Sequence, residues 1–290
     1  MVNNLTPSLH FTSLFSAPVE SMLKDGGRVL DIQESNGNWA IDLANLYPDA
    51  SVTAIDVCNS YTKDDTPANC TFKDCAIDRP LPFDDASFDF VFMRRTLMTV
   101  PTDIRNRVLL PEVKRVLKPG GYFEWMASNW WREGPLLLGL WVIELWCGYK
   151  DGIVEPSEAD GPPIGGPKSI QFSRDLIAAM KNMGYDNCLG SHINEDVAAL
   201  GLMFVNCTVL GVPLGYAAGD VVGRSLANVS HDIFQSSKQI LINMWQITEE
   251  EYNQRVAEVE HEWNHVQAAT IKHRTVIARK IQSTNVEDPN

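Results

Sequence analysis

The strongest constraint on the fold is a repeated pattern of short apolar runs, each followed by a polar turn and a helical segment. Residues 28–32, "RVLDI", and residues 51–57, "SVTAIDV", have the composition of buried strands, and each carries an acid near its end. Residues 39–46 between them have helical spacing and stop before Pro48, because proline cannot continue a helix. Strands that alternate with helices predict a parallel sheet covered by helices on both faces.

The same reasoning extends the pattern toward the end of the chain. Further elements are predicted, comprising strands at residues 70–76, 87–95, 121–128, 206–215 and 273–280 and a helix at residues 105–117. Another helix, with Ser173 as its N-cap, is predicted at residues 173–185. Two long amphipathic helices are expected after residue 215, and the second begins where Thr248 and Glu251 match a capping box.

Composition and charge restrict the class of partner. The 290 residues carry a formal net charge of -13, which argues against nucleic acid or an anionic membrane as the main partner. The longest apolar run contains Glu144 and is too short to span a bilayer, and no signal peptide is recognised. Six cysteines without metal-ligand spacing are expected to be reduced thiols, so a cytoplasmic or nuclear protein is predicted.

The distribution of aromatic, glycine and proline residues predicts how the chain is divided. Residues 1–290 are expected to form a single domain with a core at residues 28–128. Residues 129–170 begin with a dense aromatic segment and end in a Gly/Pro-rich loop, which predicts an insertion that packs over the open edge of the sheet. Residues 171–290 supply C-terminal helices and closing strands. The tryptophans around this insertion, Trp125 among them, suit an aromatic-lined small-molecule site, plain core packing or a dimer interface.

The order of these signals, with Asp31 and Asp56 near the ends of the first two strands, resembles the class I (Rossmann-like) methyltransferases that use S-adenosylmethionine (SAM). The C-terminal sequence, from "VPLGYAAGD" to "TVIARK", is similar to the fungal small-molecule methyltransferases, a group that includes relatives of a regulator of secondary metabolism. The resemblance implies an α/β fold with a doubly wound, seven-stranded, mostly parallel sheet whose last strand is antiparallel. It also implies that residues 28–128 are a cofactor-binding core, with SAM at the carboxyl ends of the first strands. The helical insertion at residues 129–170 would then be a lid over the substrate mouth, and a C-terminal helical cap would follow it.

In that family the first strand leads into a turn with three spaced glycines, and the matching residues here are Asp31, Gln33, Ser35 and Gly37. Only Gly37 is a glycine, so the motif is degenerate. Glycines let the backbone approach the methionine part of the cofactor, and the Gln33 side chain is expected to crowd that approach. If Gln33 blocks the pocket, Gln33→Gly is expected to increase SAM affinity.

The resemblance assigns further residues to the cofactor. They are Asp56 with Val57 for the ribose, Asp74 with Cys75 for the adenine, and Met93 with Arg94 for the methyl-transfer pocket. A carboxylate suits the ribose because it offers two acceptor oxygens to two hydroxyl donors. Each acid is also consistent with an ordinary turn residue, and Arg94 with an ion pair to Asp31 or Glu34.

No residue is identified as the catalytic group by sequence alone. Methyl transfer from a sulfonium depends largely on in-line positioning, and a general base helps when the acceptor is a hydroxyl. None of the six histidines directly follows the fourth or fifth predicted strand. The candidates are Arg94 and Glu124, and Glu124 is expected either to be buried with a raised pKa or to face solvent. His261 and His265 lie one helical turn apart, but without a third ligand an exposed helix face is favoured and no metal is predicted.

Three functions stay open at this level. The favoured one is a transferase, a SAM-dependent methyltransferase acting on a secondary-metabolite-like small molecule. The degenerate turn leaves open a pseudo-methyltransferase that catalyses another reaction, such as a cyclisation, with or without SAM. The acidic surface and the tryptophan-rich insertion leave open a homodimer or a regulatory protein partner.

Overall fold

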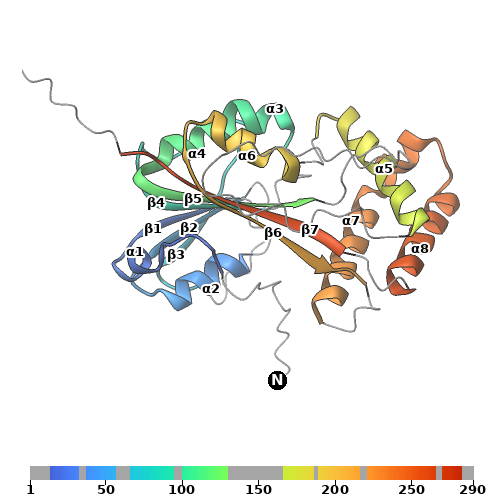
Figure 1. The fold of residues 1–290 in the computed structure, drawn as a ribbon, viewed down its shortest axis with the longest axis horizontal. Coiled ribbons are helices and arrows are strands. Elements are labelled where there is room, and N and C mark those ends of the chain that lie inside the picture. Colours follow the sequence, from blue (N-terminus) through green and yellow to red (C-terminus); the bar gives the residue numbers. More distant parts are fainter. Residues whose placement is uncertain are drawn as a thin grey trace, which may run out of the picture.

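The computed structural model describes residues 14–32, 37–56, 66–94, 100–129, 166–185, 189–215, 221–265 and 270–282, and Figure 1 shows how their helices and strands are arranged. Some residues singled out in the sequence lie outside this part of the chain. They are Gln33, Ser35, Val57 and residues 130–165 of the predicted insertion.

Seven strands of the described residues form one sheet in the order β3-β2-β1-β4-β5-β7-β6. Their bounds are β1 (Arg28–Ile32), β2 (Ser51–Asp56), β3 (Cys70–Asp74), β4 (Phe88–Arg94), β5 (Leu117–Asn129), β6 (Met203–Pro213) and β7 (Thr270–Arg279). Strands β1 to β5 all pair in parallel with one another, and β7 is antiparallel to both β5 and β6. The predicted doubly wound, mostly parallel sheet with an antiparallel last strand is therefore confirmed.

Helices cover both faces of this sheet (Figure 1). Their bounds are α1 (Glu20–Lys24), α2 (Asn38–Leu46), α3 (Thr102–Ile104), the π-helical turn η1 (Arg105–Leu109), α4 (Leu110–Val116), α5 (Pro167–Asn182), α6 (Leu189–Ala199), α7 (Val221–Trp245) and α8 (Glu249–His265). Helices α1 and α2 lie on one face, and α3, α4 and α6 lie on the other. Helices α5, α7 and α8 form a group beside the ends of β6 and β7. None of the helices that the structure describes is long and apolar enough to cross a membrane.

Two helix starts show how far local sequence rules reach. The capping box is confirmed, because the Thr248 N–H donates to Glu251 Oε2 at 2.8 Å and the Glu251 N–H donates to Thr248 Oγ1 at 3.1 Å. The predicted N-cap at Ser173 is wrong, since α5 begins six residues earlier and the Ser173 hydroxyl donates to the Ser169 carbonyl at 2.7 Å. The start of α5 is capped instead by the Glu262 carboxylate of α8, which accepts the Ser169 N–H at 2.7 Å.

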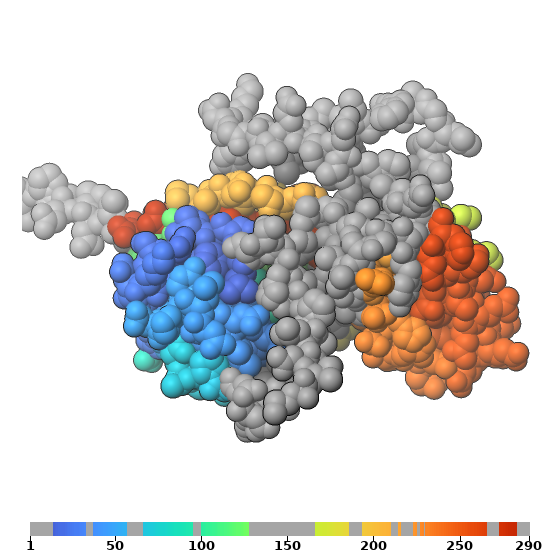
Figure 2. Space-filling view, turned by 90° about the horizontal axis from the view of Figure 1, so that it is seen from below, coloured from blue at the N-terminus to red at the C-terminus, as the bar shows by residue number. Residues whose placement is uncertain are grey.

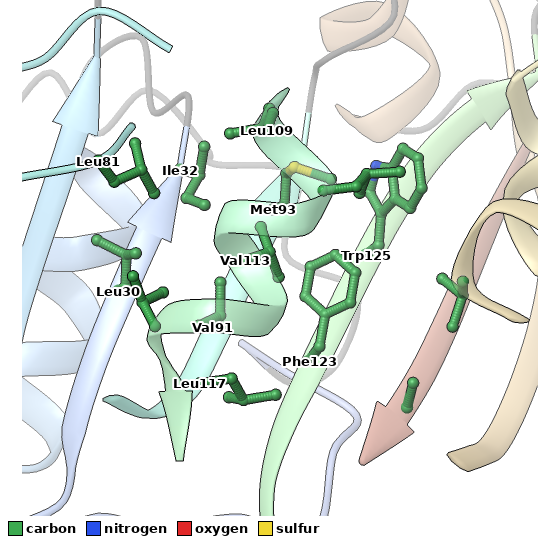
Figure 3. Close-up of a cluster of buried hydrophobic side chains, with 14 of the residues drawn as sticks. Leu30, Ile32, Leu81, Val91, Met93, Leu109, Val113, Leu117, Phe123 and Trp125 are labelled. Atoms are coloured by element: carbon green, nitrogen blue, oxygen red, sulfur yellow. The ribbon is translucent and has the colours of Figure 1, made fainter. Parts of the chain in front are cut away.

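Buried side chains form a separate cluster on each face of the sheet and a third among α5, α7 and α8. The cluster on the α4 face includes Leu30, Ile32, Val91, Met93, Phe123 and Trp125 (Figure 3). The cluster on the α2 face includes Val29, Trp39, Leu43, Phe90, Phe92 and Ile277. Because Trp125 is fully buried in the first cluster, the core-packing interpretation holds for this tryptophan.

Candidate functional site

The candidate cofactor residues meet at one edge of the sheet. Ile32, Ile55 and Met93 are paired side by side across β1, β2 and β4, so the next residue on each strand lies one step closer to the carboxyl edge. That step places Asp56 on β2, paired with Asp74 on β3, and Arg94 on β4 in one row. Neighbouring strands are about 4.8 Å apart, so the backbones of Asp56 and Arg94, with β1 between them, are separated by roughly 10 Å.

These side chains share the face that α2 covers. Successive residues of a strand point to opposite faces, so residues two apart share a face. Phe92 and Ala54 pair with Asp31 and belong to the α2-face cluster. Arg94 and Asp56 follow them by two residues and therefore point to the same face. The Asp31 side chain is fully buried, Asp56 is 6% exposed, and Asp74 is exposed. The sheet therefore gathers three carboxylates and one guanidinium at the edge where open α/β sheets bind ligands.

Helix α2 begins shortly after β1 ends at this edge of the sheet. Its N-cap, Gly37, has φ 76 and ψ -2, a left-handed conformation that glycine adopts without the steric cost of a Cβ. Two residues later the Trp39 ring stacks on Phe92, with ring centroids 4.2 Å apart. The retained glycine of the degenerate turn is thus a position where the backbone conformation itself favours glycine.

Arg94 lies against these two rings. Its guanidinium carbon is 5.8 Å from the ring centroid of Phe92 and 6.0 Å from that of Trp39, which are distances of cation–π contacts. The side chain is half-buried at the end of β4. The ring contacts define where the guanidinium lies, two residues beyond the row of Asp31, at the carboxyl edge of the sheet.

Two other predicted contacts are arranged differently from the expectation. The Met93 side chain is fully buried on the α4 face, between Leu109 and Trp125, so it does not share a face with Arg94 (Figure 3). The backbone N–H of Cys75, expected to donate to the adenine, already donates to the Asp56 carbonyl at 2.9 Å. Burial raises the pKa of the Cys75 thiol, so this side chain is a neutral, core-facing group.

Glu124 is buried with a raised pKa, which was one of its two expected environments. It lies beside Phe92 in the row of Asp31, on the same face, and its side chain is fully buried. Burial raises the pKa of Glu124 to about 7, and the N–H groups of Ser16 and Ala17 oppose this rise. Its carboxylate is engaged by these backbone donors rather than by the carboxyl edge of the sheet, which disfavours a catalytic role.

His273 is a group at this edge that sequence reasoning did not place. Because β7 is antiparallel to β5, the start of β7 meets the end of β5, and His273 pairs with Ser128. Alternation along β7 places His273 on the face of Ile277, which is the α2 face. Burial lowers the pKa of His273 to about 4, so the imidazole is neutral near pH 7. The alternating pattern of the last strand could have shown that His273 points to one face of the sheet. Only the strand order shows that His273 lies beside the end of β5.

The part of the chain that the structure describes contains no group of three His, Cys, Asp or Glu side chains able to hold a metal ion. The exposed pair on α8 is self-contained, since His265 Nδ1 donates to the His261 carbonyl at 2.7 Å and the two rings are 4.1 Å apart. The interpretation as an exposed helix face fits this geometry.

Comparison with known proteins yields one family and several partial matches. Residues 29–121 match the family model described as a methyltransferase domain. "Methyltransferase str2" of Strobilurus tenacellus is 35% identical over 95 residues, which cover 33% of each chain. "Demethylmenaquinone methyltransferase" of Staphylococcus aureus is 32% identical over 104 residues, which cover 34% of this chain and 42% of that protein. The chain therefore matches only about a third to two fifths of the length of these relatives.

A solved structure extends the similarity over most of the chain. The YcgJ protein of Bacillus subtilis superposes with a TM-score of 0.50 at 17% identity, over 94% of this chain and 100% of that one. At this identity the match shows the fold alone. Together with the strand order and the match of residues 29–121, it leads to one conclusion. The described residues have the Rossmann-like fold of class I methyltransferases, and residues 29–121 within this fold match a methyltransferase domain.

Proposed function

We propose that the protein transfers a methyl group from SAM to a small-molecule acceptor. The observation that carries this proposal is the buried Asp56 at the carboxyl end of β2, inside the segment that matches a methyltransferase domain. Two relatives that match about a third of this chain are named methyltransferases, and the name of one gives demethylmenaquinone, a small molecule, as its substrate. The finer acceptor class, a secondary-metabolite-like molecule, comes from the C-terminal resemblance.

The described residues fit the two ends of such a cofactor. Asp56 offers two acceptor oxygens to a pair of ribose hydroxyls, which are donors. Arg94, about two strands away on the same row, offers a fixed fork of N–H donors that matches a carboxylate. Bound SAM would supply a methyl group already activated by the sulfonium charge, so the protein's task is to orient the acceptor and exclude water.

Titration calorimetry with SAM and S-adenosylhomocysteine tests the proposal, after mass spectrometry has excluded carried-over cofactor. Wild-type protein is expected to bind with a Kd in the micromolar range, and Asp56→Asn to weaken binding by about tenfold or more, because hydrogen bonds to a charged group are lost. Asp49→Asn is the matched control, since Asp49 is exposed just before the opposite end of the same strand.

The outcomes separate the possibilities clearly. Binding that is lost in Asp56→Asn and kept in Asp49→Asn supports the proposal and justifies a search for the acceptor with isotope-labelled SAM. A wild-type protein free of cofactor that binds neither compound would overturn it.

A further inference from the structure

Glu124 connects the centre of the sheet to a segment far away in the sequence. Its Oε2 accepts the Ser16 N–H at 2.9 Å and the Ala17 N–H at 2.7 Å, across more than one hundred residues. The Glu124 side chain is fully buried. Burying a carboxylate is costly unless donors are present, so these backbone N–H groups and Glu124 require one another.

The segment of residues 14–17 contacts both ends of helix α2. The Leu14 carbonyl accepts a hydrogen bond from Trp39 Nε1 at 2.6 Å, in the first turn of the helix. The Phe15 ring lies 6.0 Å from that of Tyr47, which caps the last turn, and 6.0 Å from Phe90 of β4. Residues 14–17 therefore bridge Glu124 of β5 and the whole length of α2.

Trp39 carries this bridge to the candidate cofactor edge. It follows Gly37, the retained glycine, by two residues, and its ring stacks on Phe92. The Arg94 guanidinium lies over the same two rings. A shift of residues 14–17 would therefore move the indole that supports both the first turn of α2 and Arg94.

We propose that Glu124 is a positioning residue of the cofactor site, which holds residues 14–17 against Trp39 and thereby fixes the first turn of α2 and Arg94 in the arrangement that binds SAM. The inference rests on the proposed function, since it names how that site is held. It assigns to Glu124 a role at a distance from the cofactor, through Trp39, instead of a contact with the reacting atoms.

A matched pair of variants tests this role. Glu124→Gln keeps the side-chain shape but replaces one acceptor oxygen by an N–H₂ donor, which conflicts with the backbone N–H groups. Glu262→Gln makes the same change at a second carboxylate that accepts two backbone N–H groups, those of Lys168 and Ser169, in the distant cluster of α5, α7 and α8. Figure 2 shows α8 in orange-red on the right and the first helices in blue on the left.

Two measurements are made at 10 °C on the purified 290-residue chain of the wild type and of each variant. They are the Kd for SAM by calorimetry and the hydrogen-exchange rate of peptides covering residues 14–19 and 37–42 without SAM. We expect Glu124→Gln to raise the Kd about tenfold or more and to speed exchange in both peptides, because only the protein molecules with the segment in place bind well. Glu262→Gln is expected to change neither the Kd for SAM nor the exchange rates of these two peptides, even if it lowers the melting temperature as much as Glu124→Gln does.

Each result decides between the roles. A SAM Kd in Glu124→Gln within about twofold of wild type, with faster exchange at residues 14–19, would show a merely structural residue and overturn the inference. Wild-type protein that binds neither SAM nor its product would instead overturn the proposed function. If Glu124→Gln does not fold, Trp39→Phe replaces it, since it removes the Nε1–H bond to Leu14 and keeps a smaller aromatic ring beside Phe92. Trp263→Phe, in the distant cluster, is then the control.

Discussion

The indole of Trp39 stacks on the ring of Phe92, with 4.2 Å between the ring centroids and 9° between the ring planes. This contact joins the first turn of α2 to the last residues of β4, two elements separated by more than forty residues in the sequence. Because Trp39 is only 3% exposed and also donates to the Leu14 carbonyl, it is a buried anchor of the helix rather than a surface aromatic group. The stability of the first turn of α2 should depend on Trp39.

Trp39→Ala is therefore expected to lower the free energy of unfolding by roughly 3–5 kcal/mol, because the change removes a large buried ring and leaves a cavity. Urea denaturation followed by circular dichroism measures this value. Leu46→Ala, at a position of the same helix that is 61% exposed, is the control and should cost less than about 0.5 kcal/mol. Similar losses in both variants would show that the stack does not anchor the helix.

A second prediction concerns the pH dependence of stability. The pKa of Glu124 is raised from 4.5 to about 7, chiefly by burial, so the folded protein keeps this proton at a pH where the unfolded chain has lost it. The stabilising contribution is complete below about pH 4.5 and is lost as the pH rises through 7. A rise from 4.5 to about 7 corresponds to roughly 3 kcal/mol.

Glu124→Gln removes this titration, so the difference in unfolding free energy between wild type and variant should change between pH 5 and pH 8, in favour of the variant. Denaturant titrations at intervals across this range measure the difference, and Glu262→Gln provides the comparison for a carboxylate at a different site. A wild-type-minus-variant difference that stays constant from pH 5 to pH 8 would contradict the raised pKa.

Sequence reasoning succeeded where the determining contacts are local. The helix that stops before Pro48 and the reciprocal bonds of Thr248 and Glu251 depend on neighbours within a few residues, so a pattern could predict them. The strand order followed from the resemblance to a family rather than from any strand alone. Residues 33–36, which carry most of the degenerate turn, lie outside the described residues, so their predicted contacts stay predictions.

The rest depended on contacts between distant segments. The donors to Glu124 lie more than one hundred residues away, and no periodicity in the sequence relates Ser16 or Ala17 to it. His273 reaches the carboxyl edge only because β7 is antiparallel to β5. The resemblance assigned Met93 to the methyl-transfer pocket, but alternation along β4 puts its side chain on the face opposite to that of Arg94.

A buried ion pair on the α4 face provides a third prediction. Arg105, in η1, is 1% exposed, and its Nη2 lies 3.5 Å from Asp196 Oδ2 of α6. Asp196→Ala would leave the guanidinium buried without its carboxylate, which is expected to cost about 3–5 kcal/mol. Glu195→Ala, at the exposed neighbouring position, is the control for helix α6.

The double variant Arg105→Met with Asp196→Ala isolates the cause. It should be more stable than Asp196→Ala alone, because the buried guanidinium charge is gone and the methionine retains much of the packing against Trp125. Thermal and urea denaturation of the three proteins measure these differences. A double variant less stable than Asp196→Ala would show that packing of the arginine stem, not its charge, dominates at this position.

The final prediction concerns the left-handed backbone at Gly37. With φ 76, any residue with a Cβ pays a steric cost there, which is roughly 1–2 kcal/mol for alanine. Asparagine tolerates this conformation better than other residues, so Gly37→Asn should recover part of the loss caused by Gly37→Ala. The free energy of unfolding from urea titration measures both, and an alanine variant as stable as the asparagine variant would mean that φ is not the constraint. The ranking wild type, then Asn, then Ala would instead show that this one glycine of the turn is required by backbone conformation, independently of any ligand.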